Sequence, residues 1–225
     1  MDLVLVDEEI SDRVIEVKEG ESLNLNLAAF KAFPAVKIDI KVARNATLTA
    51  VFADFSKGEG RFVLNVYLED EGASCDWHLA ALGNGTSRKV FDTSVWHNSP
   101  HTTGSMSNYG ICRDESRLTF TGTSEIKRGS KGSSTRQSAK IIVFDPLSDG
   151  KCSPILNIDE NDVTASHAAV VGKLNEDHLF YIMSRGLSMD DAKRLITLGY
   201  MKPIEAYFTS DSLKQRIDDA IEGGI

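Results

Sequence analysis

The fold of this chain is decided by strictly alternating stretches, of which VKIDIKV at residues 36–42 and LNLNL at residues 23–27 are the clearest. Apolar side chains occupy every second position, which is the period of a β-strand with one face on a core and the other in water. Similar short runs occur at residues 14–17, 62–68 and 139–143, and glycine-containing turn clusters occur at residues 57–60 and 83–87. The pattern predicts an all-β body from Leu3 to about Val171.

Periodicity alone does not separate a two-sheet sandwich from a parallel β-helix. A sandwich would show clear two-residue hairpin turns, and only Gly83-Asn84-Gly85 resembles one. The spacing of the runs is irregular and no exact internal repeat is visible. Both architectures therefore stay open at this level.

The apolar positions follow a helical period from Asn175 onward. Residues 176–185 carry an apolar stripe that ends at Gly186, and Ser188 stands where the N-cap of a following helix is expected. A last helix is predicted to start near Ser210. We expect these segments to form a small helical bundle, which divides the chain into a β-body at residues 1–172 and a helical region at residues 173–225.

The charge balance restricts the partners of this chain. There are 33 acidic and 25 basic residues among 225, with a formal net charge of -8. Such a surface repels phosphate backbones, so nucleic-acid binding is not expected, and the basic residues between Lys127 and Lys140 are interpreted as solvated turns. No apolar run approaches the ~20 residues that cross a bilayer. The residues after Met1 lack a signal-peptide pattern, and we therefore expect a cytoplasmic protein with no membrane contact.

The three cysteines, Cys75, Cys112 and Cys152, lie far apart and form no C-x-x-C pair. Their spacing indicates neither a disulfide framework nor a self-contained metal-cluster site. Each is read most simply as a small buried apolar side chain.

The most specific motif is DENDVTASHAAVVGKLNEDHLFYIMSRGL at residues 159–187. It closely resembles the carboxy-terminal signature of the SufB/SufD family, D-V-x-x-S-H-x-A-x-V-G-x-L followed by L-F-Y-x-x-S-R-G. Upstream, residues 97–102 resemble the family's H-x-x-P-x-T segment, and residues 120–126 with Gln137 resemble its F-x-G-x-x-x-I…Q stretch. Together these matches span about residues 90–205.

The resemblance implies a fold and a set of partners. The fold class expected from it is an all-β right-handed parallel β-helix with a small C-terminal α-helical region. It further implies a scaffold subunit of iron–sulfur cluster assembly in the SUF system, not an enzyme. Such a subunit pairs through its β-helix with itself or with a SufB/SufD-type subunit, and its helices dock a SufC-type ABC ATPase. The chain carries no Walker A pattern, so ATP hydrolysis would come from that partner.

His167 is the first candidate site residue. It lies between Ser166 and two alanines, small neighbours that leave an imidazole accessible. The resemblance implies that the matching histidine of SufD-type subunits faces the subunit interface and takes part in cluster formation. Neutral imidazole binds iron, so His167 is expected to hold the nascent iron–sulfur cluster, a transient cofactor. The alternative is a structural histidine that forms hydrogen bonds at the strand-to-helix junction.

A thiol is missing where the family's SufB type has one. Matching the family glutamine to Gln137 puts Ser138 at the cysteine position, which makes this chain SufD-like there. Cys152 is the cysteine nearest to His167 in sequence and is the second candidate ligand for the metal. It would need an environment that lowers its pKa, because the thiolate is the form that binds iron.

The other histidines and two functional alternatives are interpreted as follows. His97 and His101 are four residues apart on a turn or strand, which does not place them together as a metal pair. His78 is interpreted as a packing residue and His178 as a surface residue of a helix. A purely architectural subunit that docks the ATPase without touching iron is the main functional alternative, and a β-helical polysaccharide lyase or hydrolase is the second.

Overall fold

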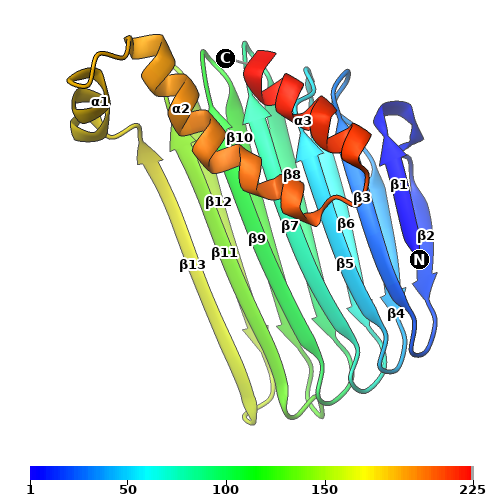
Figure 1. Ribbon diagram of the computed structural model, residues 1–225. Coiled ribbons are helices and arrows are strands. Elements are labelled where there is room, and N and C mark those ends of the chain that lie inside the picture. The colour runs from blue at the N-terminus through cyan, green and yellow to red at the C-terminus, as the bar shows by residue number, and fades with distance from the viewer. Residues whose placement is uncertain (224–225) are drawn as a thin grey trace.

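The computed structural model describes residues 1–223 and shows a parallel β-solenoid with three C-terminal α-helices (Figure 1). Two parallel sheets form its walls. We call them sheet A, with strands β1 (Asp2–Val6), β3 (Ser22–Ala29), β5 (Thr47–Asp54), β7 (Ser74–Gly83), β9 (Thr103–Cys112), β11 (Ser133–Val143) and β13 (Val163–Lys173), and sheet B, with strands β2 (Arg13–Val17), β4 (Lys37–Val42), β6 (Glu59–Leu68), β8 (Arg88–His97), β10 (Arg117–Ile126) and β12 (Asp149–Ile158). The chain alternates between the sheets, so each strand of sheet A and the next strand of sheet B make one rung. A short 3₁₀-helix, η1 (Asp7–Glu9), joins the strands of the first rung.

The parallel β-helix expected from the resemblance is thus confirmed, and the sandwich is excluded. The turn at Gly83-Asn84-Gly85 does not form a hairpin, because it joins β7 of sheet A to β8 of sheet B. Gly85 adopts a left-handed backbone conformation with φ of 58°, and its N–H donates to Asp114 Oδ2 of the next rung at 2.7 Å. The turn therefore stacks on another turn instead of reversing the chain.

The spacing between rungs explains why no repeat is visible in the sequence. Successive paired positions of sheet A, Ser22, Thr47, Ser74, Thr103 and Ser134, are 25, 27, 29 and 31 residues apart. The interval thus grows along most of the solenoid and is 30 residues at the last step, from Ser134 to Thr164. A search for a fixed period cannot align such rungs.

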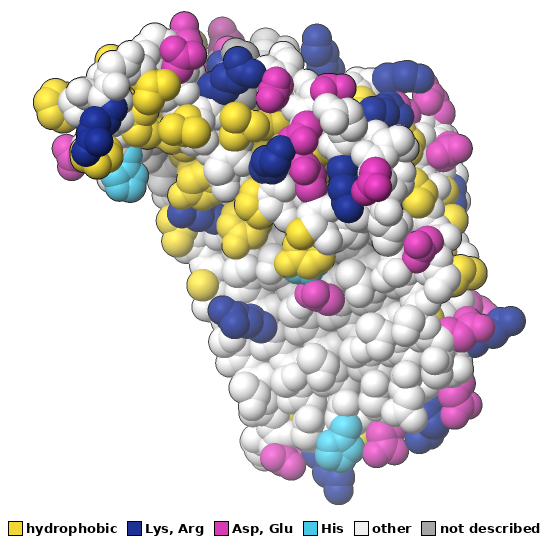
Figure 2. Space-filling model, in the orientation of Figure 1, with side chains coloured by type: hydrophobic (Ala, Val, Ile, Leu, Met, Phe, Trp, Pro, Cys, Tyr) yellow, Lys and Arg dark blue, Asp and Glu magenta, His cyan; other side chains and the backbone are white. Residues whose placement is uncertain are grey.

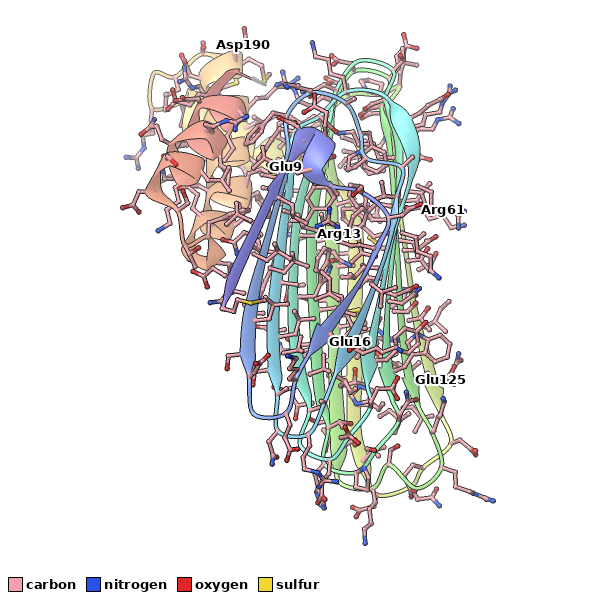
Figure 3. The ribbon with its side chains drawn as sticks, turned by 90° about the vertical axis from the view of Figure 1, so that its right-hand side faces the viewer. Glu9, Arg13, Glu16, Arg61, Glu125 and Asp190 are labelled. Carbon is pink, nitrogen blue, oxygen red and sulfur yellow. The ribbon has the colours of Figure 1, made fainter. Side chains whose placement is uncertain are left out.

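The core lies between the two sheets and is filled by the inward half of each alternating stretch. In β4, Ile38, Ile40 and Val42 are fully buried. Larger rings contact one another from rung to rung, with Phe91 and Phe120 ring centroids 5.6 Å apart. Figure 3 shows this filled space edge-on. Each such apolar side chain contributes about 1.5–3 kcal/mol when fully buried, which is why the alternation dictates the fold.

The expected C-terminal helical region is confirmed, and its helices contact one another while they form a layer on sheet A. Helix α2 (Met189–Met201), the 3₁₀-helix η2 (Lys202–Tyr207) and helix α3 (Asp211–Gly223) cross the outer face of the sheet (Figure 1). Their buried side chains pack against outward apolar residues of sheet A; both sets form one second core: Ala28, Val51, Ala53, Ala80, Leu82, Ile111, Ile142, Phe144, Met201, Ile204, Phe208, Leu213, Ile217 and Ile221. The helices bury their stripes on the sheet because it offers this apolar band.

Polar contacts fix the helical layer in register. Asn26 Oδ1 accepts the N–H of Thr209 at 3.0 Å, and Lys140 Nζ donates to Tyr200 Oη at 2.7 Å. The predicted N-cap is confirmed, since Ser188 Oγ accepts the N–H of Asp191 at 3.1 Å. Among residues 1–223, no helix has both the length and the apolar character needed to cross a membrane.

Helix α1 (Glu176–Met183) is attached more loosely than the others. Only Leu179 of this helix is buried, and Phe180 keeps 76% of its surface exposed. Gly186, with φ of 93°, ends the segment, as the sequence predicts. In Figure 1, α1 lies beyond the end of β13.

Candidate functional site

The last rung of the solenoid, β12 and β13, is uncovered. The strands from β3 to β11 are paired on both sides, whereas β12 pairs only with β10 and β13 only with β11 within the described residues. Both strands therefore present an unpaired row of backbone N–H and C=O groups. Such an edge favours addition of a strand from another chain.

Exposure of inward-facing positions marks this end of the core. Ile141 of β11 is fully buried, but Val171, its partner on β13, is 44% exposed. Ile126 of β10 is likewise buried, while its partner Ile158 on β12 is 40% exposed. The sequence continues the core pattern into the last rung, and nothing in the described residues covers it. The open end therefore has apolar surface to offer a partner.

His167 lies in the middle of β13, on the side that faces the core in the preceding rungs. It pairs with Gln137 of β11, which is buried, while His167 itself is exposed. The structure shows no hydrogen bond from its ring to another described residue. His167 lies six residues before the end of the strand at Lys173. It is therefore not at the strand-to-helix junction, where the alternative of a structural histidine would place it.

The layer beneath His167 is polar. Gln137 Nε2 donates to Ser124 Oγ at 2.8 Å and to the carbonyl of Ile155 at 3.0 Å. Its Oε1 atom is buried without a hydrogen-bond partner in the described residues. Polar groups thus line the core floor at the open end, in contrast to the stacked rings farther down the solenoid. Sequence reasoning noted Gln137 only as part of a motif, since its inward orientation depends on the register.

Cys152 does not have the environment that a ready metal ligand needs. It lies on the inward face of β12, where it pairs with Phe120, and it is half-buried. Burial raises the pKa of its thiol to about 11, so the side chain is protonated near neutral pH. Burial likewise raises the pKa of Cys112 to about 12 and that of Cys75 further. The pKa of each thiol is therefore raised, whereas the hypothesis from the sequence requires a lowered pKa for Cys152.

The residues of the open end do not form a complete metal site by themselves. Within residues 1–223, no group of three or more His, Cys, Asp or Glu side chains gathers in a way that could hold a metal ion. Ser138, at the position of the missing thiol, faces the outer side of sheet A, where its Oγ donates to Ser107 Oγ at 3.2 Å. A thiol at this position would therefore project on the other face from His167.

The remaining histidines are accounted for by packing or exposure. His97 is fully buried at the end of β8, with Nδ1 2.8 Å from Thr102 Oγ1, and burial lowers its pKa to about 4. His101 is exposed in the following turn, so the two do not converge on a metal. His78 packs against Tyr207 with ring centroids 3.5 Å apart, and His178 is exposed on α1.

A second candidate surface covers α1 and the start of α2. Its exposed apolar side chains are Phe180, Tyr181, Met183, Leu187, Met189 and Leu195. In Figure 2, hydrophobic side chains gather over this end of the helical layer, while the lower part of sheet A is almost free of them. A groove of about 650 Å³ runs between α1 and the ends of β11 and β13, with Phe180, Met183 and Phe144 in its wall. Surfaces of this kind are typical of protein–protein contacts.

Comparison with known proteins gives these two surfaces a family context. The family model described as "SUF system FeS cluster assembly, SufBD core domain" matches residues 17–200. The iron–sulfur cluster assembly protein SufD of Bacillus subtilis is 30% identical over 155 residues, which are 69% of this chain and 36% of that protein. SufD of Escherichia coli is 24% identical over 192 residues, 83% of this chain and 45% of that protein. SufB of Bacillus subtilis is 26% identical over 137 residues, 60% of this chain and 29% of that protein.

These alignments cover less than half the length of each relative. The family-model match at residues 17–200 nevertheless includes the solenoid from β3 onward, the open rung with His167 and most of α2. The expectation raised by the motif at residues 159–187 is therefore confirmed: the chain belongs to the SufB/SufD family, through the SufBD core domain of the SUF system.

Proposed function

We propose that this chain is a SufD-like scaffold subunit for iron–sulfur cluster assembly, with the open rung as its pairing face. The observation that carries the proposal is the exposed imidazole of His167 on an uncovered, apolar edge, in a chain of the SufB/SufD family. The role is one of holding and positioning, without a catalytic step of its own. The cluster is the cargo of this scaffold.

Pairing at the open rung has a physical reason. Two edge strands can share their free backbone groups, and the exposed apolar side chains beside them then leave water. Ile155, Ile158, Val170 and Val171 supply that apolar surface. The partner is a second copy of this chain or a SufB-type subunit, since either brings a matching edge. In both cases His167 lies at the seam between the subunits.

The partner has to complete the cluster site. His167 offers one nitrogen ligand, the half-buried Cys152 is protonated near neutral pH, and the described residues form no cluster of three metal-binding side chains. Iron–sulfur clusters are held mainly by cysteine thiolates. A SufB-type subunit with a thiol near its own edge strand would supply what this chain lacks. This favours a heterodimer as the species that loads the cluster.

The helical surface is proposed to dock a SufC-type ATPase. Phe180 and Leu195 point their apolar side chains outward, and the neighbouring groove can receive a complementary side chain. Because α1 follows β13 after only two residues, movement of a protein bound there would be transmitted directly to the strand that carries His167. This gives a mechanical route from the ATPase to the open rung.

The test is anaerobic reconstitution of the SufB-type pair with iron and sulfide, followed by visible absorption. His167→Ala is expected to keep the fold and the pairing but to lose most of the cluster absorption. His101→Asn is the matched control, because His101 is exposed in a turn with φ of 56° and asparagine tolerates that conformation. Full absorption with His167→Ala would leave the architectural role as the function of this chain.

A further inference from the structure

A cavity beneath α2 has a charge that is unusual for this protein. Its volume is about 430 Å³, within the range of about 300–1,000 Å³ typical of small-molecule sites. Lys140, Lys173 and His178 line it, and none of the side chains in its wall is a carboxylate. The chain as a whole has more acidic than basic residues, so a wall with basic side chains and no carboxylate is not what average composition produces.

The basic side chains of this wall have no acidic partners among the described residues. Lys140 Nζ donates to Tyr200 Oη at 2.7 Å and lies 4.6 Å from the centre of the same ring, so its position is fixed by a neutral group. Within residues 1–223, Lys140, Lys173 and His178 take part in no ion pair, although twelve pairs occur elsewhere. Glu176 and Asp177 follow in α1 but do not line the cavity. A half-buried ammonium held without a counter-ion attracts an anion.

Apart from Asn175 and Tyr200, the rest of the wall is apolar. Ile142 of β11, Val170 of β13 and Ile196 of α2 supply aliphatic surface on three sides. A ligand that fills the cavity would therefore need an apolar body as well as a negative group. Inorganic phosphate alone would satisfy only the cations.

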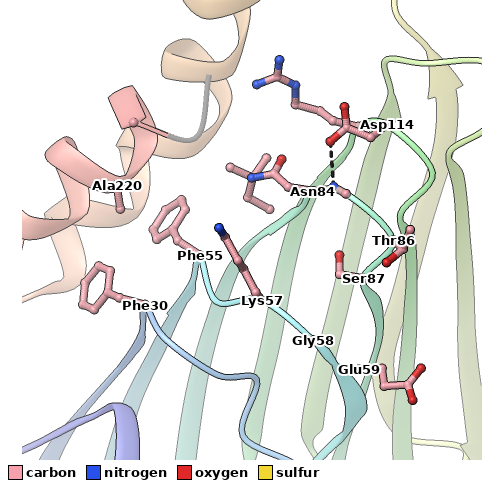
Figure 4. Close-up of a pocket in the computed structure, with 14 residues that line it drawn as sticks. Phe30, Phe55, Lys57, Gly58, Glu59, Asn84, Thr86, Ser87, Asp114 and Ala220 are labelled. Atoms are coloured by element: carbon pink, nitrogen blue, oxygen red, sulfur yellow. Dashed lines mark hydrogen bonds between the residues drawn. The ribbon is translucent and has the colours of Figure 1, made fainter.

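Other cavities of the described residues show a different balance. The larger cavity beside α3, about 870 Å³, combines Lys57 and Arg113 with Glu59 and Asp114, as Figure 4 shows for three of these side chains. In the groove beside α1, Lys193 is already paired with Asp145 at 3.1 Å. Neither has the excess of cations found beneath α2.

We infer that the cavity beneath α2 binds a small carboxylate or phosphate ester with an apolar body. Such a ligand contacts β13 through Val170, α1 through His178 and α2 through Tyr200. It would tie the edge strand to the two helices that follow it. The inference rests on the cavity alone and does not depend on cluster assembly.

The test compares three probes that share a phenylbutyl skeleton: 4-phenylbutyrate, 4-phenylbutanol and 4-phenylbutylamine. Binding is followed by amide shifts in ¹H–¹⁵N NMR spectra, with Gly172 and Gly199 of the cavity wall as reporters. The acid is expected to bind saturably and shift both reporters. The alcohol is expected to bind at least about tenfold more weakly, because it lacks the charge-assisted hydrogen bond. The amine is expected to show no measurable binding.

Substitutions of the wall residues test whether the acid binds in this cavity. Lys140→Gln is expected to weaken the acid at least about tenfold and to leave the alcohol unchanged. Lys173→Gln, at an exposed position where folding is not at risk, is expected to weaken the acid about threefold. Lys41→Gln, exposed on the outer face of sheet B, is the matched control and should have no effect. Equal binding of acid and alcohol, shifts away from both reporters, or indifference to both wall variants would overturn the inference.

Discussion

Placing a charge on the open rung should separate the proposed subunits without unfolding either. Val171→Lys is the most direct change, because Val171 faces the uncovered end of the core and is 44% exposed in the single chain. A lysine at this position can keep its ammonium in water as long as the chain is alone. On pairing, that ammonium would be trapped at an apolar seam.

The size of the effect follows from the exposed fractions. Full burial of a valine or isoleucine side chain contributes about 1.5–3 kcal/mol. With 40–53% of Ile155, Ile158, Val170 and Val171 still exposed, each has roughly 1 kcal/mol left to gain on pairing. Eight such side chains in a symmetric pair give about 8 kcal/mol, comparable with the cost of association, about 4–15 kcal/mol. Pairing is therefore sensitive to a loss of a few kcal/mol of apolar burial.

The substitution occurs twice in a symmetric dimer. Each lysine removes roughly 1 kcal/mol of valine burial and adds at least about 1 kcal/mol for a poorly solvated polar group. The sum is about 4 kcal/mol, which corresponds to a roughly thousandfold higher Kd. In a heterodimer with a SufB-type subunit the substitution occurs once, and the expected rise is about thirtyfold.

Sedimentation velocity over a concentration series measures both cases. Val14→Lys serves as the matched control, because Val14 is a 63% exposed valine on β2, at the opposite end of the solenoid. We expect wild type and Val14→Lys to pair alike and Val171→Lys to remain monomeric. Undiminished pairing of Val171→Lys, or a chain that is monomeric both alone and with a SufB-type subunit, would refute the assignment of the seam.

Two further predictions concern stability. Because burial lowers the pKa of His97 to about 4, this histidine takes up a proton in the unfolded chain at a higher pH than in the folded chain, near pH 6.5. The His97 contribution to the free energy of unfolding should therefore fall by about 3 kcal/mol between about pH 6.5 and 4 and stay constant above that range. Urea titrations of His97→Gln at several pH values should lack this pH dependence. Asp54→Ala should lower the free energy of unfolding by about 3–5 kcal/mol, because it leaves the fully buried Lys89, whose Nζ lies 2.6 Å from Asp54 Oδ2, without its counter-charge. Replacing both residues together, Asp54→Leu with Lys89→Met, should cost less, and a double variant as unstable as the single one would contradict this account.

The sequence predicted the strands well and their arrangement less well. Alternation in stretches such as residues 36–42 identifies the core side of each strand, because burial has a period of two in any sheet. It contains no information on which strand lies next to which, so the choice of a β-helix depended on the motif at residues 159–187. The helices were predicted, but not the face of sheet A that they cover, because outward residues such as Val51 and Ile111 look like ordinary exceptions to alternation until the helices are seen to cover them.

The candidate site was predictable only in part. His167 could be selected from a motif, but its exposure depends on β13 being the last strand of its sheet. The raised pKa of Cys152 arises from burial beside Phe120, a neighbour 32 residues away in sequence. The cationic cavity is formed by residues from two strands and two helices, and no local pattern joins Lys140 to Tyr200.

The growth of the rungs also limits how copies of this chain can stack. Strands β1 and β2 have five residues each, whereas β13 has eleven and β12 has ten. A narrow first rung cannot fully satisfy the wide last rung of another copy, so head-to-tail addition would leave half of the hydrogen-bonding groups unmatched. Two wide ends match each other, and such a contact closes after two molecules. In the proposed pairing, two wide last rungs would therefore meet and form a closed pair.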